Sequence, residues 1–277
     1  MIKKISFFLL TAILSVAWVN FKPVKPVLYL IGDSTVEDGS GNKGLWGWGK
    51  FFPRFFDTSR ITIRNYAQGG TSARTFQTNG IWNKNINKRG MWDTVYSKLK
   101  KGDYLLIQFG LNDQGPIADT SRARGTLKGT GPDSVLIYNA VTKQQEVVHT
   151  FGWYIRRYVR LAKAKGVTVI VCSSVPKNDW KDGKLLRDEL GFASWALQVA
   201  KEEGAYQIDL NNKVADVYDA EGQDSVTVKY HIAEDHVHTV SAGAILNARL
   251  VSKGIVAILP EGCRLGDYIN KATINEN

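Results

Sequence analysis

The chain has 277 residues, of which 44% are hydrophobic and 22% are charged, a balance typical of one compact globular unit with a large buried core. The sequence has no internal repeat and no low-complexity tract, which argues against a repeat array or a disordered chain. The formal net charge of +10 favours anionic partners such as nucleic acid, anionic lipid or an acidic polysaccharide. A basic protein with no particular partner is an equally good interpretation.

The N-terminus has the pattern of a signal peptide. Two lysines precede an apolar run over residues 5–18, and small residues at Ser15 and Ala17 favour cleavage after Ala17. An uncleaved membrane anchor is the alternative, but it is disfavoured because a spanning helix needs about 20 apolar residues. We therefore predict a signal peptide over residues 1–17, a secreted or periplasmic location, and no stable membrane association after cleavage.

Residues 18–277 are expected to form a single catalytic domain of alternating strands and helices. Apolar runs predict strands at 27–34, 61–67, 103–110, 167–175 and 206–210. Helical patterns lie between and after them, at 48–56, 91–99, 151–165, 186–203 and 241–259. This alternation predicts an α/β fold, a three-layer α/β/α sandwich with a five-stranded parallel sheet.

A long polar segment, residues 115–143, interrupts the alternation of strands and helices. It is rich in Gly, Thr, Ser and Arg, and we expect a loop with a hairpin that begins near residue 134. Long loops in compact domains are often functional, so this segment is a candidate substrate-binding flap. In open parallel sheets the ligand crevice lies beyond the carboxyl ends of the strands, where we expect the site.

Three of the expected strand ends carry residues that suit acyl transfer. Ser34 follows the first strand, Gly70 lies in a glycine pair after the second, and Asn112 follows the third. Taken singly, each has an ordinary interpretation. A serine at this position often caps a helix, a glycine pair often forms a plain turn, and an asparagine is often a loop residue or a helix cap. Taken together at successive strand ends, they supply a nucleophile and donors for an oxyanion.

An acid and a base lie three residues apart near the C-terminus. The spacing of Asp235 and His238 puts both side chains on the same side of one turn, so the carboxylate can orient the imidazole toward Ser34. His236, next to Asp235, should point elsewhere. The alternative is a metal site formed by the histidine cluster that also includes His231, but no HxxxH or HExxH pattern accompanies it.

These residues together predict a serine hydrolase that needs no metal. Ser34 would attack, His238 would act as the base and Asp235 would orient it. The backbone amides of Ser34 and Gly70, with the side-chain amide of Asn112, would bind the oxyanion, and each such donor is typically worth about 2.7–4 kcal/mol.

The chain resembles the SGNH (GDSL-type) hydrolases, with Ser34, Gly70, Asn112 and His238 at the four signature positions of that family. Finer matches, to the rhamnogalacturonan acetylesterases, are the segments NYAQGGTSARTF, FGLNDQ, HTFGWYIRRYV, SSVPKNDW and DHVHTVSAG. The resemblance runs from about residue 27 to 250. It implies a flavodoxin-like sandwich and an esterase that removes acetyl groups from rhamnogalacturonan, a pectin-type polysaccharide, without a cofactor.

Three alternatives remain open beside this interpretation. The same site would serve an acetylesterase for another glycan such as xylan. A lipase or thioesterase would need a long apolar groove, whereas the segment after Gln114 is polar. A non-catalytic polysaccharide-binding protein with the same fold should have lost Ser34 or His238, and both are present.

Several residues are candidates for binding an acetylated acidic polysaccharide or oligosaccharide. Arg74, beside the glycine turn, would pair with a uronate carboxylate, and Trp46 and Trp48 would offer flat faces to sugar rings, although packing of the first helix explains the tryptophans equally well. His236 would line the crevice. Arg122 and Arg124 are better explained as a solvated charge run. We expect a monomer that does not bind nucleic acid.

The sequence contains two cysteines, Cys172 and Cys263. Export would permit a disulfide between them. A buried free thiol at Cys172, which lies in an apolar run, is an alternative of at least equal weight.

Overall fold

The computed structural model describes residues 25–39, 42–78, 91–118, 120–188 and 190–275. Its central sheet is parallel and has the order β3 (Thr62–Asn65), β1 (Val27–Gly32), β4 (Tyr104–Gln108), β7 (Thr168–Cys172) and β10 (Tyr206–Ile208). The prediction of a five-stranded parallel sheet is confirmed. The strand order reverses at β1, which pairs with β3 on one side and β4 on the other, and ligands bind at such a point in open α/β sheets.

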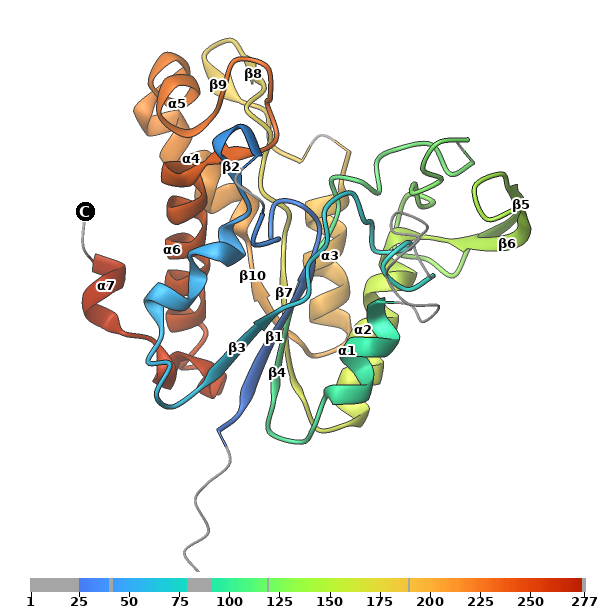
Figure 1. The fold of residues 1–277 in the computed structure, drawn as a ribbon, viewed down its shortest axis with the longest axis horizontal. Coiled ribbons are helices and arrows are strands. Elements are labelled where there is room, and N and C mark those ends of the chain that lie inside the picture. The colour runs from blue at the N-terminus through green and yellow to red at the C-terminus, as the bar shows by residue number, and fades with distance from the viewer. Residues whose placement is uncertain (1–24, 40–41, 79–90, 119, 189, 276–277) are drawn as a thin grey trace, which may run out of the picture.

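The helices form two layers, one on each face of the sheet (Figure 1). One face carries α1 (Met91–Lys98), α2 (Phe151–Ala164) and α3 (Phe192–Glu202). The other carries α4 (Leu210–Glu221), α5 (Gln223–Tyr230), α6 (Ser241–Ala257), and the short 3₁₀ helices η2 (Trp48–Lys50) and η3 (Phe52–Phe55). Successive strand residues point to opposite faces, so Leu28 and Leu30 pack in one layer while Tyr29 and Ile31 pack in the other.

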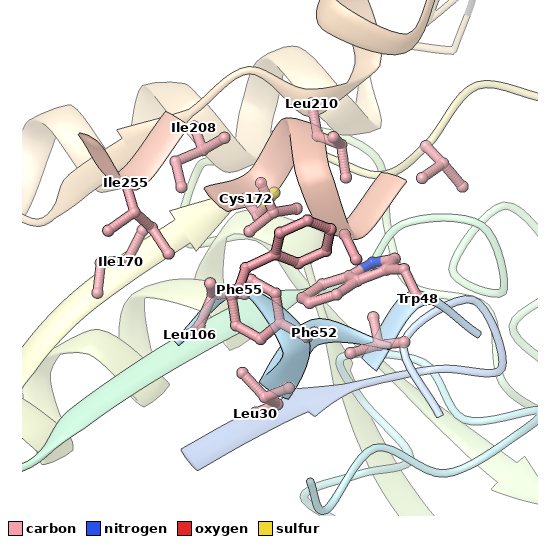
Figure 2. Close-up of a cluster of buried hydrophobic side chains, with 14 of the residues drawn as sticks. Leu30, Trp48, Phe52, Phe55, Leu106, Ile170, Cys172, Ile208, Leu210 and Ile255 are labelled. Atoms are coloured by element: carbon pink, nitrogen blue, oxygen red, sulfur yellow. The ribbon is translucent and has the colours of Figure 1, made fainter. Parts of the chain in front are cut away.

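The layer under α6 contains a cluster of large aromatic side chains (Figure 2). Trp48 and Phe52 pack edge to face with ring centroids 5.0 Å apart, a favoured aromatic geometry. Cys172 and Cys263 both lie in this cluster as free thiols, so the structure has no disulfide between them. Burial raises the pKa of both thiols, which keeps them protonated and unreactive.

Some expected helices differ from those in the structure. The helix expected over 48–56 is instead the pair η2 and η3, because Pro53 at the start of η3 cannot donate a backbone hydrogen bond. The helix expected from residue 186 begins only at Phe192, after Gly191 at φ 84°. The helices α4 and α5 were not expected at all. Asp209, assigned to the fifth strand, instead caps α4 by accepting the N–H of Asn212.

Smaller elements complete the fold. The long polar insert ends in a hairpin, as expected, formed by β5 (Ser134–Asn139) and β6 (Gln144–His149), which projects from the side of the sandwich (Figure 1). A second hairpin joins β8 (Trp180–Lys181) to β9 (Lys184–Leu185). The short strands β2 (Leu45–Trp46) and β11 (Thr239–Val240) pair with each other. The remaining short helices are η1 (Asn42–Gly44), η4 (Arg264–Tyr268) and α7 (Lys271–Asn275).

The predicted signal peptide over residues 1–17 lies outside the described residues. Across the part of the chain that the structure describes, no helix has the length and apolar character to cross a membrane.

Candidate active site

Ser34 lies in a tight turn directly after β1, at the edge of the sheet where the parallel strands end. The N–H groups of Val36 and Glu37 both donate to the Asp33 carbonyl, at 3.1 and 3.0 Å. Gly47 packs against the turn so closely that a Cβ there would lie 2.7 Å from the Ser34 carbonyl oxygen. The backbone around the serine is therefore held on two sides, and the side chain remains partly exposed.

A buried hydrogen-bonded chain supports this turn from below. Trp48 Nε1 donates to Gln108 Oε1 at 3.0 Å, and Gln108 Nε2 donates to Thr35 Oγ1 at 2.7 Å. Thr35 in turn donates through N and Oγ1 to Asp33 Oδ1, at 2.9 and 2.7 Å. All four side chains are buried. The prediction that Trp48 offers a flat face to substrate is wrong, because the ring is a core residue whose N–H fixes the Ser34 turn.

Ser34, His238 and Asp235 form a continuous hydrogen-bonded chain. His238 Nε2 lies 2.8 Å from Ser34 Oγ, and His238 Nδ1 lies 2.7 Å from Asp235 Oδ2. The other oxygen of Asp235 accepts the N–H groups of Val237 and His238, at 2.9 and 2.8 Å. Partial burial raises the pKa of Asp235, but these hydrogen bonds outweigh this effect, so the pKa is lowered overall. The ionised carboxylate therefore holds the ring with Nε2 toward the serine.

The glycine turn and Asn112 lie together beside this chain. Asn112 Nδ2 donates to the Thr71 carbonyl at 2.8 Å, which ties the β4 end to the segment after Gly70. A Cβ on Gly69 would lie 3.7 Å from Ser34 Cβ, so the turn is next to the serine. Gly70 has φ 78°, a conformation that favours glycine. One Nδ2 hydrogen of Asn112 remains for a ligand, since an amide nitrogen has two.

Asp113 is a buried residue of the site that sequence reasoning missed. Its carboxylate accepts the Ala73 N–H, with distances of 3.1 and 3.2 Å to the two oxygens. Burial, with a smaller effect of the nearby Asp33 charge, raises the pKa of Asp113 to about 8. Burial also raises the pKa of Asp33. The only sequence signal was the position of these acids, one directly before Ser34 and one directly after Asn112.

Arg74 does not face the crevice, and its predicted pairing with a uronate is wrong. The side chain is fully buried, and its guanidinium donates to both carboxylate oxygens of Glu146, at 2.7 and 2.5 Å. It also donates to the carbonyls of Ile117 and Gly125, both at 2.8 Å. Arg74 therefore binds the long insert to the segment after Gly70. Arg122 is exposed, whereas Arg124 is half-buried and its charge slightly lowers the pKa of Asp33.

The three C-terminal histidines have separate partners. His231 is buried between the Tyr218 hydroxyl and the His238 carbonyl, each at 3.0 Å, and burial lowers its pKa. His236 is 60% exposed and lies 3.0 Å from Asp179, away from the serine, as expected. In the described residues, no three His, Cys, Asp or Glu side chains are grouped to hold a metal ion.

Trp46 is half-buried in β2, which pairs with Thr239 directly after His238. Its ring packs edge to face on Phe51, and the Lys50 ammonium lies 5.6 Å from the ring centroid. Its position beside the triad is compatible with a sugar contact, which stays a prediction.

The strand-end serine, the imidazole and the amide donors have the arrangement of an acyl-transfer site, and the sequence matches a known family of that chemistry. The model of the GDSL-like lipase/acylhydrolase family matches residues 30–244. The chain belongs to this family. It is a carboxylic ester hydrolase, and the predicted family and α/β fold are both confirmed.

Curated relatives cover nearly the whole chain. A rhamnogalacturonan acetylesterase of Emericella nidulans is 29% identical over 245 residues, which are 88% of this chain and 89% of the relative. The rhamnogalacturonan acetylesterase RhgT of Bacillus subtilis is 29% identical over 262 residues, which are 90% of this chain and 95% of the relative. The solved structure of Bacillus subtilis YxiM shares the fold, with a TM-score of 0.65 at 24% identity. The match covers 86% of this chain and 57% of YxiM.

Proposed function

We propose that this esterase is exported and removes acetyl groups from a pectin-type polysaccharide, rhamnogalacturonan, with Ser34 as nucleophile. The observation that carries the mechanism is the hydrogen-bonded chain from Ser34 Oγ through His238 to Asp235. This arrangement supplies a nucleophile, a base and an acid that orients the base, which together can perform acyl transfer. Export is inferred from the lysine-headed apolar run at the N-terminus. We also propose that the enzyme acts as a monomer.

The reaction proceeds in two steps through an acetyl-enzyme. His238 Nε2 takes the proton from Ser34 Oγ, which forms a bond to the acetyl carbon. The carbonyl oxygen becomes an oxyanion that accepts hydrogen bonds from Asn112 Nδ2 and from the N–H groups of Gly70 and Ser34. The C–O bond to the sugar then breaks, and His238 gives its proton to the departing sugar oxygen. In the second step His238 deprotonates a water, whose oxygen attacks the acetyl carbon; the bond to Ser34 Oγ then breaks, His238 returns the proton to Ser34 Oγ, and acetate is released.

The substrate class is inferred from the relatives and from charge. Two relatives that span most of this chain are named rhamnogalacturonan acetylesterases. A galacturonate-containing polymer is anionic, and the formal net charge, +10 for the whole chain and about +8 without the two leader lysines, attracts such a polymer over a distance set by the ionic strength.

The test compares acetate release from acetylated rhamnogalacturonan, acetylated xylan and a long-chain ester by the purified protein and its Ser34→Ala variant. We expect the highest kcat/KM on rhamnogalacturonan and a loss of at least about 10⁴-fold in Ser34→Ala. The exposed Ser59 gives a matched control, Ser59→Ala, which should keep full activity. Faster hydrolysis of xylan would replace the proposed substrate, and an active Ser34→Ala variant would refute the nucleophile.

A further inference from the structure

A cavity of about 90 Å³ lies at the edge of the sheet where the parallel strands end. Its walls include the loops after β4 and β7, represented by Leu111 and Lys177, and the first turn of α4, which follows β10 and contains Asn211. One water needs about 10–15 Å³, so the cavity has room for several waters or for part of a sugar ring.

Two lining residues place this cavity near the catalytic residues. Leu111 precedes Asn112 in the chain, and Asp179 lies 3.0 Å from His236, two residues before His238. The middle wall follows β7, which is two strands from β1 in the sheet. At about 4.8 Å between strands, β7 lies about 10 Å from β1, the strand that leads to Ser34. An acetyl group on Ser34 does not reach that far, so the cavity faces another part of the substrate.

The cavity contains one cation with no ion pair. The Lys177 ammonium lies 3.2 Å from Gln114 Oε1 and forms no salt bridge with any residue that the structure describes. The two acids of the lining already have partners. Asp179 pairs with His236, and Asp188 accepts the N–H groups of Ala193 and Ser194 at the start of α3, both at 2.7 Å. A ligand carboxylate would therefore meet an available ammonium.

Asn211 forms part of the cavity wall at the start of α4. It is 4% exposed, and its Nδ2 donates to the Ser174 carbonyl at 3.1 Å. Its Oδ1 is buried inside the protein and does not face the open part of the cavity. Asn211 therefore shapes the wall, and Lys177 supplies the charge that a ligand carboxylate would meet.

We propose that this cavity is a uronate subsite, in which Lys177 binds the carboxylate of a uronic acid unit. The inference rests on the proposed function, because the ester on Ser34 and the uronate in the cavity belong to one glycan. It assigns to Lys177 the recognition of acidic sugar that the buried Arg74 does not perform.

The kinetic test uses three substrates, which are an acetylated galacturonate oligosaccharide, the same compound with methyl-esterified carboxylates, and a neutral aryl acetate. Lys177→Met should raise KM for the acidic oligosaccharide about tenfold with kcat unchanged, since a hydrogen bond to a charged group is lost. Both parameters for the other two substrates should stay the same. Lys177→Arg should retain most of the affinity, and the exposed Lys181→Met, from the neighbouring β8, is the matched control. Unchanged KM in Lys177→Met overturns the proposal, as does an equal loss on all three substrates.

A binding test separates the subsite from the reaction. Calorimetric titration of unacetylated galacturonate oligosaccharide should show about tenfold weaker binding to Lys177→Met than to the wild type. Lys181→Met should bind as the wild type does, and the melting curves of both variants check the fold. If binding depends on Lys177 but no acetate is released from any glycan, the proposed function fails and the subsite stands. If acetate is released but Lys177→Met binds as the wild type does, the subsite fails and the function stands.

Discussion

Arg74 and Glu146 form a bidentate ion pair that joins the segment after the Gly70 turn to the β5–β6 hairpin, 72 residues further along the chain. Glu146 Oε2 also accepts the side-chain amide of Asn139 at 2.6 Å. The insert is thus attached to the wall of the site through the interior, rather than lying over the crevice as a detached flap.

Breaking this pair should destabilise the fold strongly. Arg74→Met leaves the Glu146 carboxylate without its cation in a largely buried place, which typically costs about 3–5 kcal/mol. Arg160→Met, which removes an exposed pair with Glu203, should cost less than about 1 kcal/mol. Urea unfolding of the two variants measures the difference. Equal losses of unfolding free energy would show that the buried ion pair stabilises the fold no more than the exposed pair does.

The same pair should make stability depend on acid pH. Burial raises the pKa of Glu146, but the hydrogen bonds from Arg74 and Asn139 outweigh this effect, so the pKa is lowered overall. A depressed pKa stabilises the fold above the unfolded pKa, about 4.3, and this contribution is lost as pH falls through the folded pKa. Melting temperature should therefore fall less steeply below about pH 4.3 in Glu146→Gln than in the wild type. If the melting temperatures of the two proteins fell equally steeply at acid pH, the result would contradict this explanation.

The two neighbouring histidines should differ sharply in their effect on catalysis. His238→Ala should fall to near-background activity, because in the part of the chain that the structure describes His238 is the group positioned to take the Ser34 proton. Asp235→Asn should lose about 10⁴-fold, since the amide no longer selects the correct tautomer. His236→Ala should keep most of the aryl acetate activity. The rate should rise with pH on its acidic limb, because the imidazole must be neutral. An inactive His236→Ala beside an active His238→Ala would reverse the assignment.

Asn112 should act on the transition state more than on binding. Asn112→Ala should lower kcat on an aryl acetate by about 10²–10³-fold with little change in KM, because the oxyanion forms only after attack. The variant also loses the hydrogen bond to Thr71, so its melting curve serves as a check on the turn. A change confined to KM would make Asn112 a substrate-binding residue.

Asp113 should reduce stability as pH rises through neutrality. Its pKa is raised to about 8, so between pH 4 and 8 the folded chain holds a proton that the unfolded chain has lost. The stability it contributes is thus present at low pH and lost as pH rises toward 8. Asp113→Asn can still accept the Ala73 N–H and does not titrate, so its melting temperature should fall less between pH 5 and 8. An unchanged pH slope would contradict this account.

The sheet and the triad were predictable from sequence because both depend on local pattern. The inner strands β1, β4 and β7 are buried on both faces and appear as continuous apolar runs, and the two edge strands were found as well. Asp235 and His238 are linked by a three-residue spacing that is independent of the rest of the fold. The helix α5 was missed because its apolar residues Val226, Val228 and Tyr230 alternate with period two, which is typical of a strand.

The environment of long polar and aromatic side chains was not predictable in the same way. Arg74 is buried because an insert more than 40 residues away folds over it and supplies Glu146 and two carbonyls. Trp48 is buried because its partner Gln108 lies on a strand 60 residues later. Lys177 did have a signal, since it follows the fourth expected strand at the edge where a ligand crevice was expected.

The pairing of β2 with β11 makes the site depend on both ends of the chain. β2 follows the Ser34 turn, β11 begins directly after His238, and their two-residue ladder joins segments separated by more than 190 positions. Contacts this distant in sequence have a high loop-closure cost and form late in folding. During refolding, ester hydrolysis should therefore return after the tryptophan fluorescence of the core has recovered, and a nascent chain would acquire activity only once Thr239 has been added.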